Sequence, residues 1–313
     1  MMSFRYYIVS VTAIFLALAL GVVLGSTNVS QRMLSVVAGD RDSLNGQISE
    51  LSSSQSQLEA SQRAGNAFAA SVGPAVVRGQ LTGRKVVLVS TPDADQADRD
   101  AVRQLVAQAG GTLTGELDLT DAVTDPARAD SARDLAIRLL PSGAQLNPSA
   151  DAGSLLGDLV SSALLMRPQD TQPRAAAAQI GAALAGLAQG GFVRAGTRPA
   201  PAQLAVVLTG GPFKGADAAD RAATLARFSA ELDRAGSGVV VAGRTGAEGS
   251  NGAVGVIRAD SVMSSTVTTV DGVQSAVGRV ATVLALREQA DGRAGRYGSG
   301  SSAQAPIPGA SAG

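Results

Sequence analysis

Lys85–Ser90 has the sequence KVVLVS, a continuous run of β-branched and aliphatic residues. Leu204–Thr209 (LAVVLT) and residues 238–242 (GVVVA) repeat this character. Runs without polar alternation are typical of strands that are buried on both faces of a parallel sheet. Stretches with helical periodicity separate these runs. The sequence therefore predicts an α/β fold, in which a mostly parallel sheet is flanked by helices.

The remaining elements of this α/β body follow from local patterns. Residues 112–119 alternate and predict a strand, and residues 254–258 and 266–270 predict two more. Asp125 and Pro126 form a good N-cap and first-turn pair for a helix. Helices are expected at residues 93–109, 125–140, 153–166, 172–189, 217–235 and 272–289.

An uncharged apolar run occupies residues 6–25 (YYIVSVTAIFLALALGVVLG). At about 1.5 Å per residue it just crosses a hydrocarbon core of about 30 Å. The alternative is a signal peptide cleaved near Gly25 and Ser26, but its apolar region is usually only about 7–15 residues long. We therefore expect a retained transmembrane anchor. No second run of this kind exists, which excludes a transporter with many spanning helices.

The charges that flank the anchor predict its orientation. Arg5 and the terminal amine precede it, and Arg32 is the first cation after it. By the positive-inside rule, the N-terminus lies in the cytoplasm. The chain has no cysteine and so needs no reducing compartment. We expect a single-pass protein of the cell envelope whose body lies outside the cytoplasm.

A heptad pattern follows the anchor. Positions a and d are mostly apolar over about four heptads, which predicts a coiled-coil stalk and a homo-oligomer formed through it. Polar residues at three a positions (Arg41, Gln55 and Gln62) weaken the pattern. The alternative is an amphipathic helix that lies on the globular domain. The core positions are Leu34, Val37, Leu44, Ile48, Leu51 and Leu58.

These patterns divide the chain into four parts. Residues 1–25 are the anchor, residues 26–70 the stalk and residues 71–290 the α/β domain. Within the domain, residues 71–83 contain three glycines and a proline and are expected to be a linker. Residues 291–313 are rich in Gly, Ser, Ala and Pro, and we expect this tail to be disordered because it cannot bury a core.

Composition excludes several classes of function. The 26 cations balance the 26 anions and only 3% of residues are aromatic, so no nucleic-acid partner is expected. Without histidine or cysteine, the usual general base and thiol nucleophiles are missing, and we expect no enzyme and no cofactor. The five methionines (Met1, Met2, Met33, Met166 and Met263) are scattered, so no metal site is expected. Met166 and Met263 are expected to fill gaps in the core.

The candidate ligand site lies at the carboxyl ends of the strands, where open α/β sheets bind ligands. Three loops follow the buried runs, at residues 91–95 (TPDAD), 210–215 (GGPFKG) and 243–246 (GRTG). Free backbone N–H groups and two cations predict an anion or an acidic partner segment there. Asp93 and Asp95 are interpreted as helix caps, and the alternative is that all three loops are ordinary turns. The candidate residues are Thr91, Gly210, Gly211, Lys214 and Arg244.

Three segments resemble the mycobacterial copper transport protein B family of actinobacteria. They are residues 5–26 (RYYIVSVTAIFLALALGVVLGS), residues 79–95 (GQLTGRKVVLVSTPDAD) and residues 268–298 (TTVDGVQSAVGRVATVLALREQADGRAGRYG). The resemblance spans nearly the whole chain, although Tyr7 stands where many members have histidine. It implies an actinobacterial envelope protein that takes part in copper transport or tolerance and is described as channel-forming in the outer membrane.

The residues themselves favour a second interpretation. A parallel α/β body on a coiled-coil stalk is not a pore, and no metal ligands lie at a suitable spacing. The alternative, which the resemblance also implies, is a non-enzymatic envelope scaffold. Its stalk and domain would dock on a membrane partner and on cell-wall or division proteins.

Overall fold

The computed structural model describes residues 4–139, 150–196 and 198–309, with the backbone alone at residues 4, 5, 24 and 26–43. Contacts divide the chain into two compact units, residues 1–64 and 65–313. We describe each unit by itself.

The first unit is helical. Its described residues belong to helix α1 (Phe4–Val77), whose last three turns lie in the second unit. Tyr6–Val23 is the one stretch of the described chain that is long and apolar enough to cross a membrane.

The predicted stalk continues the same helix. The side chains of Leu44, Ile48, Leu51 and Leu58 are between 56% and 70% exposed. Those of Leu34 and Val37 lie outside the described residues. The expected coiled coil remains a prediction, because one chain shows no partner helix.

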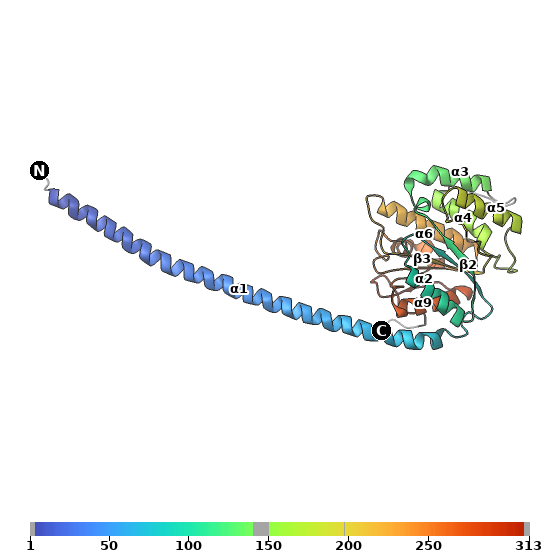
Figure 1. Ribbon diagram of the computed structural model, residues 1–313, viewed down its shortest axis with the longest axis horizontal. Coiled ribbons are helices and arrows are strands. Elements are labelled where there is room, and N and C mark those ends of the chain that lie inside the picture. The colour runs from blue at the N-terminus through green and yellow to red at the C-terminus, as the bar shows by residue number, and fades with distance from the viewer. Residues whose placement is uncertain (1–3, 140–149, 197, 310–313) are drawn as a thin grey trace. The chain divides into compact units, whose positions relative to one another are not determined.

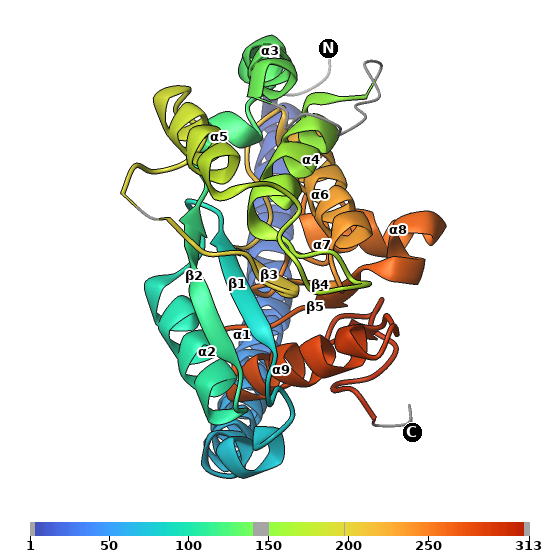
Figure 2. The ribbon, with the colours of Figure 1, turned by 90° about the vertical axis from the view of Figure 1, so that its right-hand side faces the viewer.

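The second unit, which carries the labelled elements α2 to α9 in Figure 1, contains a six-stranded parallel sheet in the order β2-β1-β3-β4-β5-β6. Figure 2 labels β1 to β5. All residues of β3 and β4 are buried, as the unbroken apolar runs predicted. The strands are β1 (Lys85–Ser90), β2 (Thr112–Asp118), β3 (Leu204–Thr209), β4 (Val239–Gly243), β5 (Thr268–Val270) and β6 (Arg296–Tyr297).

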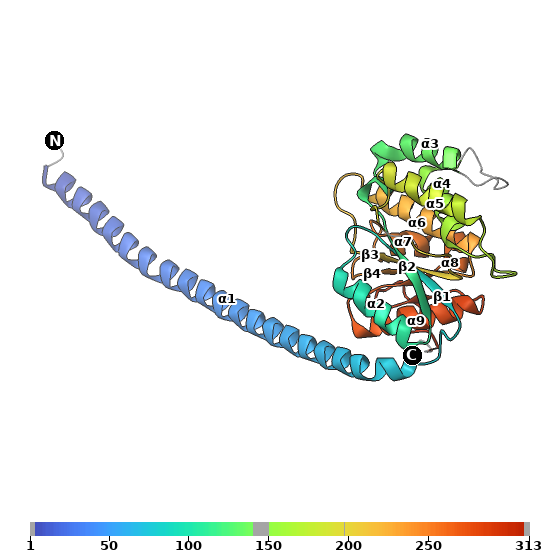
Figure 3. The same cartoon turned by 45° about the vertical axis from the view of Figure 1, so that its right-hand side comes forward.

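Helices cover both faces of this sheet (Figures 2 and 3). On one face, α2 (Gln96–Gln108) and α9 (Ala276–Ala290) pack with alternate strand residues such as Val86 and Leu88. The other face carries α6 and α7, with α4 packed on α6 and with α3 and α5 packed on α4. These helices are α3 (Ala129–Leu139), α4 (Ala152–Leu164), α5 (Ala177–Gln189), α6 (Ala218–Ala235) and α7 (Ala253–Ala259).

The strand predicted at residues 254–258 is helix α7 instead. A short apolar run does not by itself distinguish a strand from a buried helix. Strands β4 and β5 are parallel neighbours, so the chain between them must cross over one face of the sheet. Helices α7 and α8 (Ser261–Thr266) form this crossover.

The C-terminal segment also differs from the expected disordered tail. Arg296–Tyr297 pairs with β5 as β6, and Tyr297 and Ala305 are buried. Arg258 of α7 explains this order, because its guanidinium donates to the Tyr297 carbonyl at 2.7 Å and to the Ser302 hydroxyl at 3.1 Å. Asp271 receives the backbone N–H of Ser299 at 2.7 Å. The tail is therefore held by polar contacts together with a few separate apolar residues, Tyr297, Ala305 and Ile307, that pack against the core.

The expected linker at residues 71–83 begins as helix. Helix α1 continues to Val77, and the buried Gly73 lies against α9, where an added Cβ would come within 2.7 Å of Val280. Glycine thus permits a close approach between the two helices. Val77 and Leu81 are fully buried, so this segment is anchored in the core at these residues although most of its other residues are partly or fully exposed.

Asp233, near the end of α6, has a partly buried carboxylate that accepts a hydrogen bond from the backbone N–H of Val239 at 2.9 Å. Burial raises its pKa to about 6 from an ordinary value of 3.8, although hydrogen bonds from Thr266 and Val239 act in the opposite direction. Between these two values the folded state binds the proton more tightly than the unfolded state does. The contribution of Asp233 to stability therefore falls as the pH rises through this window.

We expect Asp233→Asn to stabilise the protein at pH 7 but not near pH 4. Each pKa unit corresponds to about 1.4 kcal/mol, so the gain at pH 7 is on the order of 2–3 kcal/mol. Urea unfolding of the full chain in detergent at both pH values measures it. The matched control is Asp134→Asn, at an exposed position on α3. Equal effects of Asp233→Asn at the two pH values would contradict this assignment.

Candidate functional site

The order of the strands creates a crevice at their carboxyl ends. From β1 the chain runs outward to β2, and then crosses back past β1 to β3 on its other side. The loops after β1 and β3 therefore leave the sheet in different directions. Ligands of open α/β sheets bind at such a switch point.

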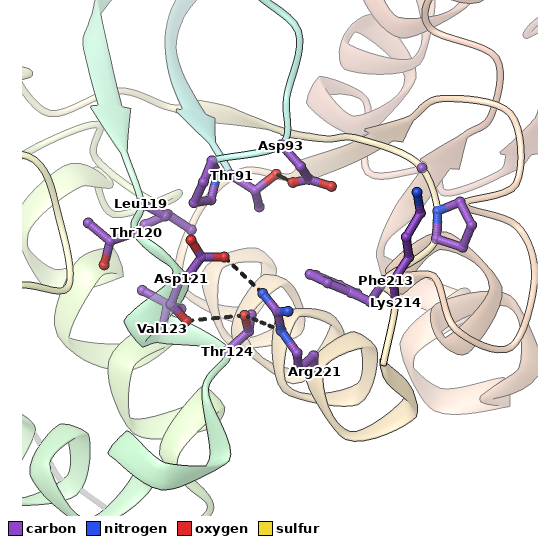
Figure 4. A pocket seen from close by; sticks show the side chains of 13 residues that line it. Thr91, Asp93, Leu119, Thr120, Asp121, Val123, Thr124, Phe213, Lys214 and Arg221 are labelled. Atoms are coloured by element: carbon purple, nitrogen blue, oxygen red, sulfur yellow. Dashed lines mark hydrogen bonds and ion pairs between the residues drawn. The ribbon is translucent and has the colours of Figure 1, made fainter. Parts of the chain in front are cut away.

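A pocket of about 480 Å³ occupies this position (Figure 4). Its size lies within the range that is usual for small-molecule sites. The loop after β2 forms a third wall beside the loops after β1 and β3, and α6 adds one side chain, Arg221. The lining residues are Thr91, Pro92, Asp93, Leu119, Thr120, Asp121, Val123, Thr124, Gly211, Pro212, Phe213, Lys214 and Arg221.

The wall after β1 is fixed by hydrogen bonds at a buried threonine. The Thr91 hydroxyl lies 2.5 Å from Asp93 Oδ1 and 3.2 Å from the Leu208 carbonyl. Gly210 lies directly against Asp93, where an added Cβ would come within 2.4 Å of Oδ2. Only glycine fits there, so Gly210 supports the carboxylate although it does not line the pocket.

The wall after β2 is joined to α6 by an ion pair. The Arg221 guanidinium donates to Asp121 Oδ1 at 2.9 Å and to the Thr124 hydroxyl at 3.3 Å. It also lies 4.8 Å from the centre of the Phe213 ring. Arg221 thereby connects the walls after β2 and β3, because Phe213 belongs to the loop after β3.

Two charges of the pocket remain unpaired within the described part of the chain. The exposed Lys214 forms no ion pair there, and neither does the exposed Asp93. The four charged lining residues comprise two cations and two anions. The pocket is therefore balanced in charge, in contrast to the basic site that the sequence predicted.

Arg244 does not line this pocket. Its guanidinium pairs with Asp98 at 2.7 Å and with Asp95 at 2.8 Å, and the hydrogen bond that it donates to Asp98 raises the pKa of Arg244. Arg279 of α9 also binds Asp98, at 2.8 Å. Arg244 therefore joins α2 to the loop after β4. Of the five predicted residues, Thr91, Gly211 and Lys214 line the pocket, and Gly210 and Arg244 do not.

The described residues contain no group of three or more acidic, histidine or cysteine side chains that could hold a metal ion. Met166 is buried and Met263 packs against the core, as expected for gap-filling residues. No thioether of this body is therefore presented at the pocket.

Sequence reasoning missed the whole wall after β2. Asp121 and Thr124 follow β2 in a segment without any known motif, and Arg221 lies in an ordinary helical pattern. One feature of the sequence could have pointed to this wall: the loop after β2, like those after β1 and β3, follows the carboxyl end of a strand. The strand order needed to place that loop beside β1 was not apparent.

Comparison with known proteins adds the family. A family model described as "Copper transport outer membrane protein, MctB" matches residues 1–308. The chain is 37% identical over 305 residues to proteins named "Copper transporter MctB" from Mycobacterium tuberculosis and Mycobacterium bovis, covering 96% of this chain and 97% of theirs. The Mycobacterium leprae protein of that name is 38% identical over 308 residues, with the same coverage. The chain therefore belongs to the MctB family of copper transport outer membrane proteins.

Proposed function

We propose that this chain takes part in copper transport or copper tolerance of the cell envelope. One observation carries the proposal: the family match runs from residue 1 to residue 308, and curated relatives at 37–38% identity are named copper transporters. Copper is the substrate of this process rather than a resident cofactor.

The chemistry of the chain indicates how it contributes. Copper ions prefer imidazole, thiolate and thioether ligands, and the sequence has no histidine and no cysteine. Met166 is buried away from solvent. The proposed role is therefore non-enzymatic. The chain supports the passage of copper together with an envelope partner that supplies the ligands, and does not hold the ion tightly itself.

The proposed placement is a single span with the body outside the cytoplasm. Tyr6–Val23 supplies a span of suitable length, and Arg5 precedes it. The family description names the outer membrane.

N-terminal sequencing of protein isolated from native membranes tests the anchor. We expect residues 1–25 to be retained. A mature chain that begins near Ser26 contradicts the anchor.

The second candidate function is a scaffold that docks membrane and cell-wall or division partners. The observation that favours it is the exposed row formed by Leu44, Ile48, Leu51 and Leu58. Residues at this spacing lie on one side of a helix and match the same row on a second copy. Because both anchors would enter the membrane in the same direction, the two helices would be parallel.

A copper challenge of cells tests the first candidate. In a bacterium that lacks the gene for this chain, we expect copper to inhibit growth at a lower concentration and cell-associated copper to rise. Re-expression of the full chain reverses both effects. Zinc at matched toxicity is the control. Equal sensitivity with and without the chain would contradict the proposed role.

Direct copper binding is measured separately. We expect the purified full chain in detergent to compete poorly with a Cu(I) chelator of micromolar affinity, because the sequence has no histidine or cysteine and its five methionines are scattered. A stoichiometric site of nanomolar affinity would show that the chain itself carries the ion. If cells without the chain are sensitive to copper and the purified chain binds copper only weakly, the chain acts on copper through a partner.

The predicted stalk dimer gives a third test. Replacing both Leu44 and Leu51 with Ala removes two core residues from each helix, each worth about 2–5 kcal/mol when buried. We expect the dissociation constant of the full chain, by sedimentation in detergent, to rise at least about 100-fold. The control replaces Ser49 and Gln57 with Ala, because the heptad pattern places these two residues outside positions a and d. A wild-type chain that is monomeric at micromolar concentration contradicts the stalk dimer.

A further inference from the structure

The pocket at the switch point leaves one charge of each sign without an ionic partner. Lys214 extends from the loop after β3, and Asp93 stands on the opposite loop after β1 (Figure 4). No ion pair joins them. The other two charges, Asp121 and Arg221, neutralise each other at 2.9 Å. A ligand therefore meets one carboxylate and one ammonium group that have no ionic partner among the described residues, although Asp93 Oδ1 already accepts a hydrogen bond from the Thr91 hydroxyl at 2.5 Å.

This pairing argues against a simple anion as the ligand. An anion at Lys214 would lie in the same pocket as two carboxylates, and like charges repel at short range. Arg244, which would have added a second free cation, is occupied by Asp95 and Asp98. A simple cation at Asp93 would be repelled in the same way by Lys214 and Arg221, which line the same pocket.

The rest of the lining is apolar or hydroxylic. Phe213 is partly exposed at the pocket and its ring faces Arg221 (Figure 4). The buried Leu119 and Val123 complete the apolar part of the lining. Thr120 and Thr124 contribute hydroxyl groups. A ligand with an apolar side chain between two opposite charges matches this distribution. The volume of about 480 Å³ accommodates a molecule of this size.

We propose that this pocket binds a zwitterion of amino-acid or short-peptide size. Asp93 accepts hydrogen bonds from the ammonium group of the ligand, and Lys214 donates to its carboxylate. A zwitterion forms both charge-assisted hydrogen bonds at the same time, whereas a ligand with a single charge forms only one of them. The apolar side chain of the ligand lies against Leu119, Val123 and Phe213.

This inference does not depend on the proposed role in copper transport, because it concerns metal-free binding to the α/β body. A failed copper challenge would contradict the copper role and would say nothing about ligand binding at the pocket. A failed binding experiment would contradict the pocket proposal and would say nothing about the copper role. The two tests are therefore separate.

The chain offers a direct reporter for this binding. The sequence contains only two lysines, Lys85 and Lys214. Labelling with ¹⁵N-lysine therefore gives two backbone amide signals in a nuclear magnetic resonance spectrum. The amide of Lys85 donates to Gln203 at 2.9 Å at the start of β1, at the opposite edge of the sheet from the pocket. It serves as an internal reference.

The probe is the dipeptide alanyl-leucine, added to the full chain in detergent at up to about 20 mM. We expect the Lys214 signal to shift in a saturable way and the Lys85 signal to stay in place. N-acetyl-alanyl-leucine lacks the ammonium group, and alanyl-leucinamide lacks the carboxylate. We expect each to bind at least about tenfold more weakly, because each loses one of the two ionic contacts.

Variants assign the two contacts. Asp93→Asn keeps the reporter and should weaken dipeptide binding at least about tenfold. Lys214→Ala should do the same in calorimetry, with little change in the thermal midpoint because this lysine is exposed. Lys85→Ala is the matched control and should bind normally.

Three results would overturn the proposal. The first is an unchanged Lys214 signal at 20 mM dipeptide. The second is equal binding of the acetylated and free dipeptides, or of inorganic phosphate, which would indicate a simple anion site. The third is a large loss of thermal stability in Lys214→Ala with no change in binding, which would indicate a structural turn.

Discussion

Burial of β3 on both faces is the constraint on which the rest of the α/β body depends. Its residues alternate between the two cores, with Val206 in one and Val207 in the other. Each core needs its own layer of helices, and parallel neighbours must be joined by crossovers that supply those helices. The helices on the two faces and the crossover helix α7 follow from this requirement.

Buried charges fix the parts of the body that apolar packing leaves open. The Arg258–Asp271 ion pair, at 2.8 Å, is 2% exposed on each side, and it holds the segment after β6. Burial lowers the pKa of Arg258, whereas its contact with Asp271 acts in the opposite direction. Asp98 likewise binds Arg244 and Arg279 from two different elements. Removing one partner of a pair buried on both sides, such as Arg258–Asp271, usually costs about 3–5 kcal/mol. The Asp98 contacts contribute less per pair, because Arg244 is 37% and Arg279 24% exposed.

The same ion pairs decide which charges are available for binding. Arg244 and Arg221 are both arginines near the carboxyl edge, yet each is held by acidic neighbours. Lys214 and Asp93 are left to face solvent in the pocket. The body thus has an electrically balanced cavity at the position where open α/β sheets bind ligands. Membership of the MctB family supplies the envelope context, and the pocket gives that family member a feature that is separate from copper chemistry.

The sequence by itself determined the class of fold, the apolar N-terminal helix and the family. Unbroken runs such as Lys85–Ser90 predict buried parallel strands because only double-sided burial removes polar alternation. It also placed Thr91, Gly211 and Lys214 at one edge, since parallel strands end on the same side. The strand order, β6 and the position of Arg244 were decided by tertiary structure alone. They depend on contacts between residues far apart in the chain, such as Arg244 with Asp98 and Arg258 with Asp271, which local patterns do not encode.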